Sequence, residues 1–220
     1  MDIKEYLSNP CGMLSIPYWK YKTLDIPSSV TIIHERDWKN QSHNYQRFFR
    51  VKHNLDNLPI VDFDFELLNI DNQAEELAAM VNSCYKDEGI TLNEQDILSW
   101  RNHKTFREYL CVYIKDNNGL MIASGIAEFD QECKEGTIEW VQVLPEYRRK
   151  GIASAITSRL AVEIMNRGKI PFYCTAWSNI RSVRNAVKSG FIPAWAEMTI
   201  KTKEFVEEAI KDKEVEENDN

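Results

Sequence analysis

The segment from Gly136 to Ala153 constrains the fold most, because it predicts a strand, a turn and a helix start in direct succession. Residues 137–143 are rich in β-branched and aromatic side chains, which favour a pleated, partly buried strand. Pro145 ends this strand, since proline cannot donate a hydrogen bond to a sheet. Beyond a short basic turn, apolar residues recur every four positions and predict a helix that stops near Gly168: Ile152, Ile156, Leu160 and Ile164.

The basic turn has the composition of an anion-binding site. The first backbone amides of a helix have no partner inside the helix, and the positive end of the helix dipole lies behind them. Gly151 lets the backbone approach a ligand, small Ala153 leaves room, and Arg148, Arg149 and Lys150 add positive charge. A diphosphate is the ligand that we expect. For these six residues taken alone, an ordinary solvated basic loop is the commoner interpretation.

The longer pattern around the turn resembles the acyl-CoA signature of the GNAT superfamily of N-acyltransferases. Residues 141–153 read Val-x-Val-x-Pro-x-x-Arg-Arg-x-Gly-x-Ala. A strand expected at 172–177 follows, then Asn179-x-x-Ser182 and the run Lys-Ser-Gly-Phe that ends at Phe191. These two motifs, in this order and spacing, are similar to those of the superfamily over residues 135–198.

The resemblance implies the GNAT fold, an α/β (α+β) architecture in which helices flank a mixed central sheet. From about Phe63 onward the chain predicts the same order of elements, β-α-α-β-β-β-α-β-α-β, ending in a strand near 197–202. Asp71 or Asn72 is expected to cap the first helix, and Thr91 with Glu94 to form a capping box before the second. The second and third strands expected in this order, 109–115 and 120–129, form a hairpin around an Asp-Asn-Asn-Gly turn.

We divide the chain into an aromatic-rich, β-rich N-terminal extension (1–62), an acyltransferase domain (63–203) and an acidic tail (204–220). Strands are expected in the extension near 28–34 and 47–52. Its many aromatic rings either form a wall of the acceptor pocket or fill the core of a small β extension packed on the main domain. The second interpretation is favoured on general grounds.

Composition limits the classes of function. The net charge of −7 argues against broad nucleic-acid binding, and much of the acidic excess lies in the tail. Five scattered cysteines, none in a Cys-x-x-Cys pair, fit reduced thiols in a cytoplasmic protein. We expect no signal peptide, no membrane span and no metal site, since the four histidines lack metal-ligand spacing. The oligomeric state is left open, a homodimer included.

The resemblance also implies a co-substrate, acetyl-CoA, and a set of contacts with it. Backbone groups of the strand would pair with the pantetheine arm, amides of the turn would hold the pyrophosphate, and Asn179 would bind the arm from the other side. For Asn179, a helix cap is the plainer alternative, and both roles can hold together. The expected contacts are Val141, Gln142, Val143, Arg148, Arg149, Lys150, Gly151, Ile152, Ala153, Ser154, Asn179 and Ser182.

Acyl transfer to an amine requires a neutral amine, so a carboxylate beside the thioester can serve as the base. Glu139 is the first candidate, because strand alternation would place it on the same face as Val141 and Val143, and Glu128 is the second. Glu139 could also bind the substrate ammonium, or could instead be a surface carboxylate or the structural partner of a nearby arginine. The tyrosine that protonates the thiolate in many GNAT enzymes is replaced here by Ala186.

The predicted function is therefore transfer of an acetyl group to a primary amine, of a small molecule in the first instance, by direct attack in a ternary complex. Two alternatives remain open at this point. The acceptor could be a protein or peptide amine, or the chain could be a non-catalytic acyl-CoA-binding regulatory module. The replaced tyrosine is mild support for the second alternative.

Overall fold

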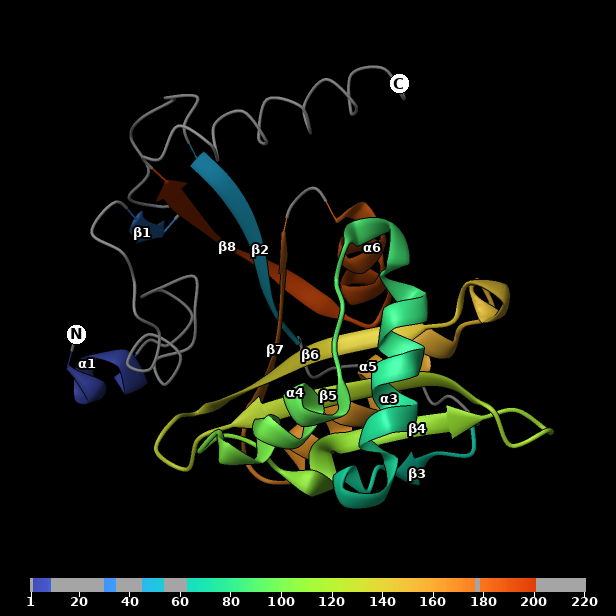
Figure 1. Ribbon diagram of the computed structural model, residues 1–220. Helices are drawn as coiled ribbons and strands as arrows, with labels where there is room; N and C mark the ends of the chain where they lie inside the picture. Colours follow the sequence, from blue (N-terminus) through green and yellow to red (C-terminus); the bar gives the residue numbers. More distant parts are fainter. Residues whose placement is uncertain (1, 9–29, 35–44, 54–62, 177–178, 201–220) are drawn as a thin grey trace, which may run out of the picture.

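A computed structural model describes residues 2–8, 30–34, 45–53, 63–176 and 179–200 of the chain. In these residues eight strands form one sheet in the order β1-β8-β2-β7-β6-β5-β4-β3 (Figure 1). Neighbouring strands are antiparallel, with β6 and β7 as the parallel pair. The strands are β1 Val30–His34, β2 Tyr45–His53, β3 Glu66–Leu67, β4 Cys111–Lys115, β5 Met121–Phe129, β6 Glu135–Val143, β7 Ile170–Ala176 and β8 Phe191–Ile200.

Helices cover both faces of this sheet (Figure 1). Helices α3 and α4 pack together on one face, while α5 lies on the other face with α6 beside it. The α-helices are α1 Ile3–Ser8, α3 Ile70–Cys84, α4 Glu94–Ser99, α5 Ile152–Met165 and α6 Ile180–Lys188. Short 3-10 turns link them: η3 Lys86–Glu88, η4 Trp100–Asn102, η5 Glu108–Leu110 and η6 Pro145–Tyr147.

The mixed sheet flanked by helices confirms the predicted fold class, and the expected order of elements from residue 63 onward is present. The two expected helix caps are wrong by a few residues. Asn69 caps α3 by accepting from the Asn72 amide. Asn93 and Asp96 form the capping box of α4, because each side chain bonds the backbone amide of the other residue.

Helix α5 packs directly against the strands that carry the expected site. A Cβ atom at Gly125 of β5 would overlap Ile156 and lie 3.1 Å from the Leu160 Cδ1 atom. A Cβ atom at Gly136 of β6 would press on Ile164 in the same way. Glycine at these two positions therefore brings α5 close to the sheet, and the apolar stripe predicted for this helix is fully buried.

The two strands expected before residue 62 are present, and both belong to the central sheet. Strand β2 lies between β7 and β8 and pairs with both, while β1 pairs with the outer side of β8. The sequence indicated these strands but not their place in the sheet. The boundary at residue 62 remains a prediction, since residues 54–62, like the acidic tail, lie outside the described residues.

The first turn of the chain also contacts the sheet. Tyr6 of α1 is fully buried, and its hydroxyl donates to the buried carboxylate of Glu135 at the start of β6. In the described part of the chain, no helix is long and apolar enough to cross a membrane.

Candidate functional site

Strands β6 and β7 separate part-way along their length. They pair from Glu135 with Ile170 to Ile138 with Tyr173, and no pairing follows beyond that point in the described residues. Figure 1 shows the two strands diverging from there. The backbone of residues 139–143 therefore borders a gap on its β7 side, as expected for a strand that receives a ligand as its next neighbour.

A β-bulge lies at the point where the strands separate. Between Glu139 and Gln142, β6 holds one residue more than β5 holds between Ser124 and Ile126. Trp140, within the bulge, has a φ of +48°, which is rare for a bulky side chain. Bulges re-aim side chains and often lie next to active sites.

The bulge overturns the expected side-chain alternation. Glu139 pairs with Ile126 and Val143 pairs with Ala123, and these partners are three residues apart on a regular part of β5. Glu139 and Val143 therefore point to opposite faces of the sheet, contrary to the prediction. Glu139 instead shares a face with Glu128, two residues from Ile126, and this is the face that α3 and α4 cover.

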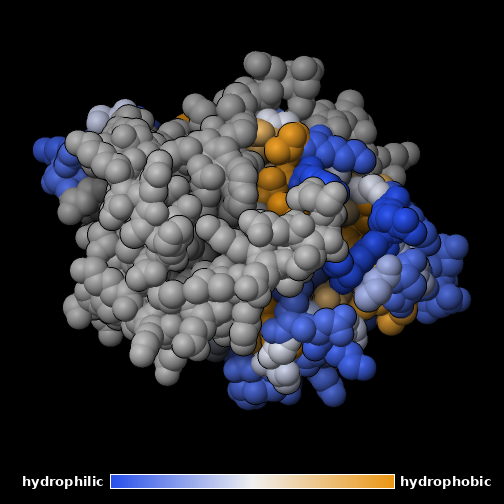
Figure 2. Space-filling model, turned by 90° about the horizontal axis from the view of Figure 1, so that it is seen from above, coloured by the Kyte–Doolittle hydropathy of each residue, from blue (hydrophilic) through white to orange (hydrophobic). Residues whose placement is uncertain are grey.

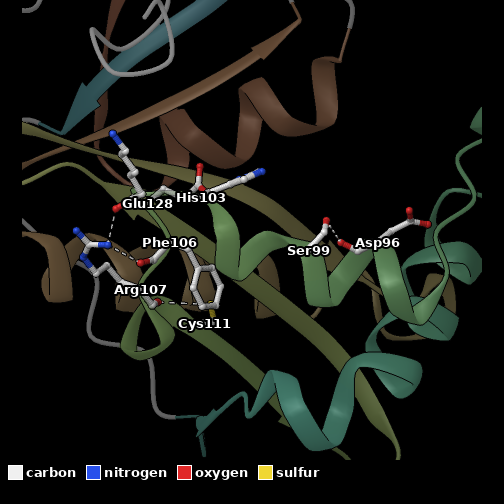
Figure 3. Close-up of polar contacts among 8 residues, drawn as sticks. Asp96, Ser99, His103, Phe106, Arg107, Cys111 and Glu128 are labelled. Atoms are coloured by element: carbon white, nitrogen blue, oxygen red, sulfur yellow. Dashed lines mark hydrogen bonds and ion pairs between the residues drawn. The ribbon is translucent and has the colours of Figure 1, made fainter. Parts of the chain in front are cut away.

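Glu128 is the more deeply placed of the two predicted carboxylates. Its residue is buried, and its Oε1 atom lies 3.5 Å from Nδ1 of His103, an exposed residue that follows η4 (Figure 3). The loop that carries His103 is held by Arg107, which donates to the carbonyls of Lys104 and Phe106.

Three aromatic rings gather beside the bulge. The ring of Trp140 stacks on that of Trp100 at 5.7 Å, and the ring of Tyr85 meets it edge-on at 6.1 Å. Tyr85 forms the C-cap of α3, and Trp100 begins η4. Sequence analysis did not identify this group, because its members lie far apart in the chain and come together only in the fold.

The turn between β6 and α5 has the geometry of an anion site. Gly151, the N-cap of α5, has a φ of +83°, and Arg149 has a φ of +64°. Left-handed residues alternating with others turn successive amides to one side, which makes a concave nest for anions. Among the described residues no side chain caps the helix at this end, and the space where a Cβ of Gly151 would project is open.

The three basic side chains of the turn differ in their contacts and exposure. The guanidinium of Arg148 donates to the Val143 carbonyl at 3.0 Å and to the Cys84 carbonyl at 3.1 Å, so it ties the end of α3 to the turn. Arg149 and Lys150 are exposed, and the Lys150 ammonium lies 4.9 Å from the ring centre of Tyr147. Arg148 thus shapes the turn, while the other two cations face solvent.

Helix α6 carries the remaining predicted residues. The Asn179 side chain caps α6 by accepting from the Ser182 amide at 3.1 Å, so the plainer alternative for Asn179 is correct, and a ligand role remains a prediction. The Ser182 hydroxyl bonds that of Tyr173 at 2.9 Å, and the Ser154 hydroxyl donates to the Asn185 side chain. Ala186 is fully buried.

The surface around this end of the molecule is mixed. Seen from the top of Figure 1, apolar side chains lie exposed between hydrophilic ones (Figure 2). The exposed large apolar residues of the described chain include Ile180 and Val187 of α6. Among the described residues, no group of three or more His, Cys, Asp or Glu side chains is arranged to hold a metal ion.

Comparison with known proteins agrees with this geometry. The family described as FR47-like protein matches residues 123–200, which include β5 to β8. Among solved structures, a GNAT-family acetyltransferase from Colwellia psychrerythraea superposes with a TM-score of 0.61 at 14% identity. A GCN5-related N-acetyltransferase from Sphaerobacter thermophilus gives 0.62 at 13% identity. The chain therefore resembles the FR47-like family over residues 123–200, and its fold is that of GNAT-family acetyltransferases.

The match to these GNAT structures is one of fold rather than of close sequence. Each of the two structural alignments covers 78% of this chain. This chain spans 65% of the Colwellia protein and 60% of the Sphaerobacter protein, less than two thirds of either. No curated protein sequence matches the chain.

Proposed function

We propose that this protein is a GNAT-type N-acetyltransferase that moves an acetyl group from acetyl-CoA to the primary amine of a small molecule. The separation of β6 from β7 carries the proposal, because the unpaired part of β6 is followed by the turn at which α5 begins. A pantetheine arm can lie along the open backbone of residues 139–143. Its pyrophosphate then meets the amides from Gly151 to Ser154, where the helix dipole favours negative charge.

The two predicted carboxylates supply the proton chemistry of this proposal. Glu139 and Glu128 lie on one face of the sheet, next to the bulge. The neutral amine attacks the thioester carbonyl carbon, the carbon–sulfur bond breaks, and the nitrogen loses a proton. Glu139, nearer to the gap, accepts this proton directly or through a water molecule, and Glu128 is the second candidate.

Replacing Glu139 tests this role. In Glu139→Gln we expect turnover to fall by about a hundredfold, the usual scale for loss of a general base, with unchanged affinity for coenzyme A. The measurement is thiol release from acetyl-CoA with a panel of primary amines, followed by kinetics on the best acceptor. Glu132→Gln, in the exposed loop before β6, is the matched control.

The outcome for each variant has a separate meaning. Unchanged turnover in Glu139→Gln would remove this residue from the mechanism, and Glu128→Gln would then test the second candidate. If no amine in the panel promotes thiol release although coenzyme A binds, the proposed acceptor class is wrong.

A further inference from the structure

Tyr85 lies beside the bulge at which β6 and β7 separate. Its ring lies against Trp140, the bulge residue of β6. The adjacent Cys84 carbonyl is held by Arg148 of the coenzyme-binding turn, so the end of α3 is fixed beside the gap. Within the described part of the chain, the Tyr85 hydroxyl has no hydrogen-bond partner, although the residue is largely shielded from solvent.

A second tyrosine approaches the same point from the other face of the sheet. Tyr173 belongs to the last residue pair that joins β7 to β6, and its hydroxyl bonds Ser182 of α6. It is close enough to Tyr85 for its charged form to raise the pKa of Tyr85. Tyr85 and Tyr173 lie on opposite faces of the sheet. Their electrostatic interaction is possible because β6 and β7 are no longer paired beyond Tyr173.

The course of the coenzyme follows from the two fixed ends of the site. The pyrophosphate site lies at Gly151, beyond the C-terminal end of β6, and the gap closes at Ile138. An arm that runs from the first point toward the second passes Val143 and then Trp140. Its sulfur atom is at the far end of the arm, and therefore arrives where Tyr85 lies.

We propose that the Tyr85 hydroxyl donates a hydrogen bond to the sulfur of bound coenzyme A and stabilises the thiolate that leaves during acyl transfer. This inference rests on the proposed function. When the carbon–sulfur bond breaks, its electron pair stays on sulfur, and a fixed donor aimed at that atom lowers the energy of the charge that develops. A partly buried donor without a protein partner also gains a partner when the coenzyme binds.

The electrostatic environment keeps this hydroxyl protonated. Burial, with smaller contributions from Tyr173, Glu88 and Cys84, raises the pKa of Tyr85 to about 12. A group with this pKa holds its proton at neutral pH and donates a hydrogen bond to the thiolate without ionising. The leaving thiolate then takes its proton from solvent, which balances the proton that the amine nitrogen has lost.

The test is a measurement on the thiol of bound coenzyme A and requires no acceptor. The ultraviolet absorbance of the thiolate is followed as a function of pH for stoichiometric complexes of coenzyme A with wild type, Tyr85→Phe and Tyr113→Phe. Tyr113 on β4 is the control, since its hydroxyl bonds Glu66 at the far edge of the sheet. We expect an acid dissociation constant of the bound thiol about tenfold smaller in Tyr85→Phe than in wild type, as for loss of one hydrogen bond to a charged group.

Each result has a distinct meaning. A thiol pKa that is equal in wild type and Tyr85→Phe, with coenzyme A bound to both, overturns the inference and leaves the proposed function intact. Failure of wild type to bind coenzyme A overturns both. An equal shift in Tyr113→Phe would show a general effect of lost hydroxyl groups and would also contradict a specific contact from Tyr85.

Discussion

Three residues with left-handed backbone surround the site, Trp140, Arg149 and Gly151. A non-glycine residue pays about 1–2 kcal/mol for such a conformation, so Trp140 and Arg149 are held there by their surroundings. For Trp140 these are the bulge and the rings of Trp100 and Tyr85. For Arg149 they are the tight turn whose shape Arg148 fixes with two backbone carbonyls.

The raised pKa of Tyr85 predicts a pH dependence of stability. A tyrosine in the unfolded chain ionises near the ordinary value of 10.0, whereas Tyr85 in the folded chain ionises near 12. The stabilisation from this group is therefore fully present below pH 10 and is lost as the pH rises toward 12. Its size is about 2–3 kcal/mol, from 1.4 kcal/mol for each pKa unit.

Tyr85→Phe isolates this contribution, because phenylalanine has no proton to lose. We expect the free energy of unfolding of wild type to fall relative to that of the variant between pH 10 and about 12. Denaturant titrations at several pH values measure the difference. Parallel pH profiles for the two proteins would show that Tyr85 ionises normally in the folded state.

At this scale the sequence predicted the turn better than the strand. The glycine, the three cations and the missing side-chain cap are local features, and the Asn179 cap is local too. The bulge depends on how β5 and β6 pair over distance. Without knowledge of the bulge, side chains of residues 138–143 are expected to point alternately to the two faces of the sheet. The prediction that Glu139 shares a face with Val143 was therefore wrong.

At the scale of elements, the contact of α5 with β5 and β6 positions the anion site. The helix lies close to the sheet because Gly125 and Gly136 have no side chains, and Ile156 and Ile164 fill that space. The N-terminus of α5 is thereby fixed relative to the open backbone of β6. The buried stripe of this helix was predicted from apolar periodicity, and the order of elements along the chain was predicted too, but the role of these glycines was not.

Gly125→Ala tests this packing. We expect a loss of about 1–3 kcal/mol in the free energy of unfolding, because the added methyl group overlaps the buried Ile156 side chain. Chemical denaturation measures the loss. In the double variant Gly125→Ala/Ile156→Ala the loss should be smaller than the sum of the single losses, since the cavity accepts the methyl group. Additive losses would mean that the two residues do not compete for space.

Helix caps show why element boundaries are harder to predict than the elements themselves. Around the start of α3 the sequence offers Asn69, Asp71 and Asn72, and each can cap a helix. The choice of Asn69 brings Ile70 into the helix as a fully buried residue. The cap position therefore agrees with the burial of Ile70 in the folded core, which a local sequence pattern does not reveal.

At the scale of the whole molecule, strand β2 places an early segment of the chain between two late strands of the sheet. It pairs with β7 on one side and β8 on the other, so a segment expected to pack outside the main domain lies inside its sheet. The sequence indicated a strand there from Phe48, Phe49 and Val51. The local sequence of a strand does not show which distant strands it pairs with. The position of β2 between β7 and β8, more than a hundred residues away in the chain, was therefore not predicted.

Removal of residues 1–62 tests the importance of this pairing. The shortened chain would expose the edges of both β7 and β8, and unpaired strand edges promote aggregation. We expect it to lose its cooperative unfolding transition and to aggregate, as measured by circular dichroism and size-exclusion chromatography. Addition of a separate 1–62 fragment should restore part of the fold. A soluble, cooperatively folding 63–220 chain would show that β2 is dispensable.

The most direct measurement is a calorimetric titration with acetyl-CoA of wild type, Gly151→Val and Gly168→Val, beside free coenzyme A. Gly168 lies three residues beyond the end of α5, with a φ of +70° and open space around it. Valine at Gly168 therefore introduces the same backbone strain as valine at Gly151, but at the opposite end of the helix. We predict saturable binding to wild type and Gly168→Val, and none to Gly151→Val, where the pyrophosphate would meet a side chain. Wild-type affinity in Gly151→Val, or no binding to wild type, would contradict an acyl-CoA site at this turn.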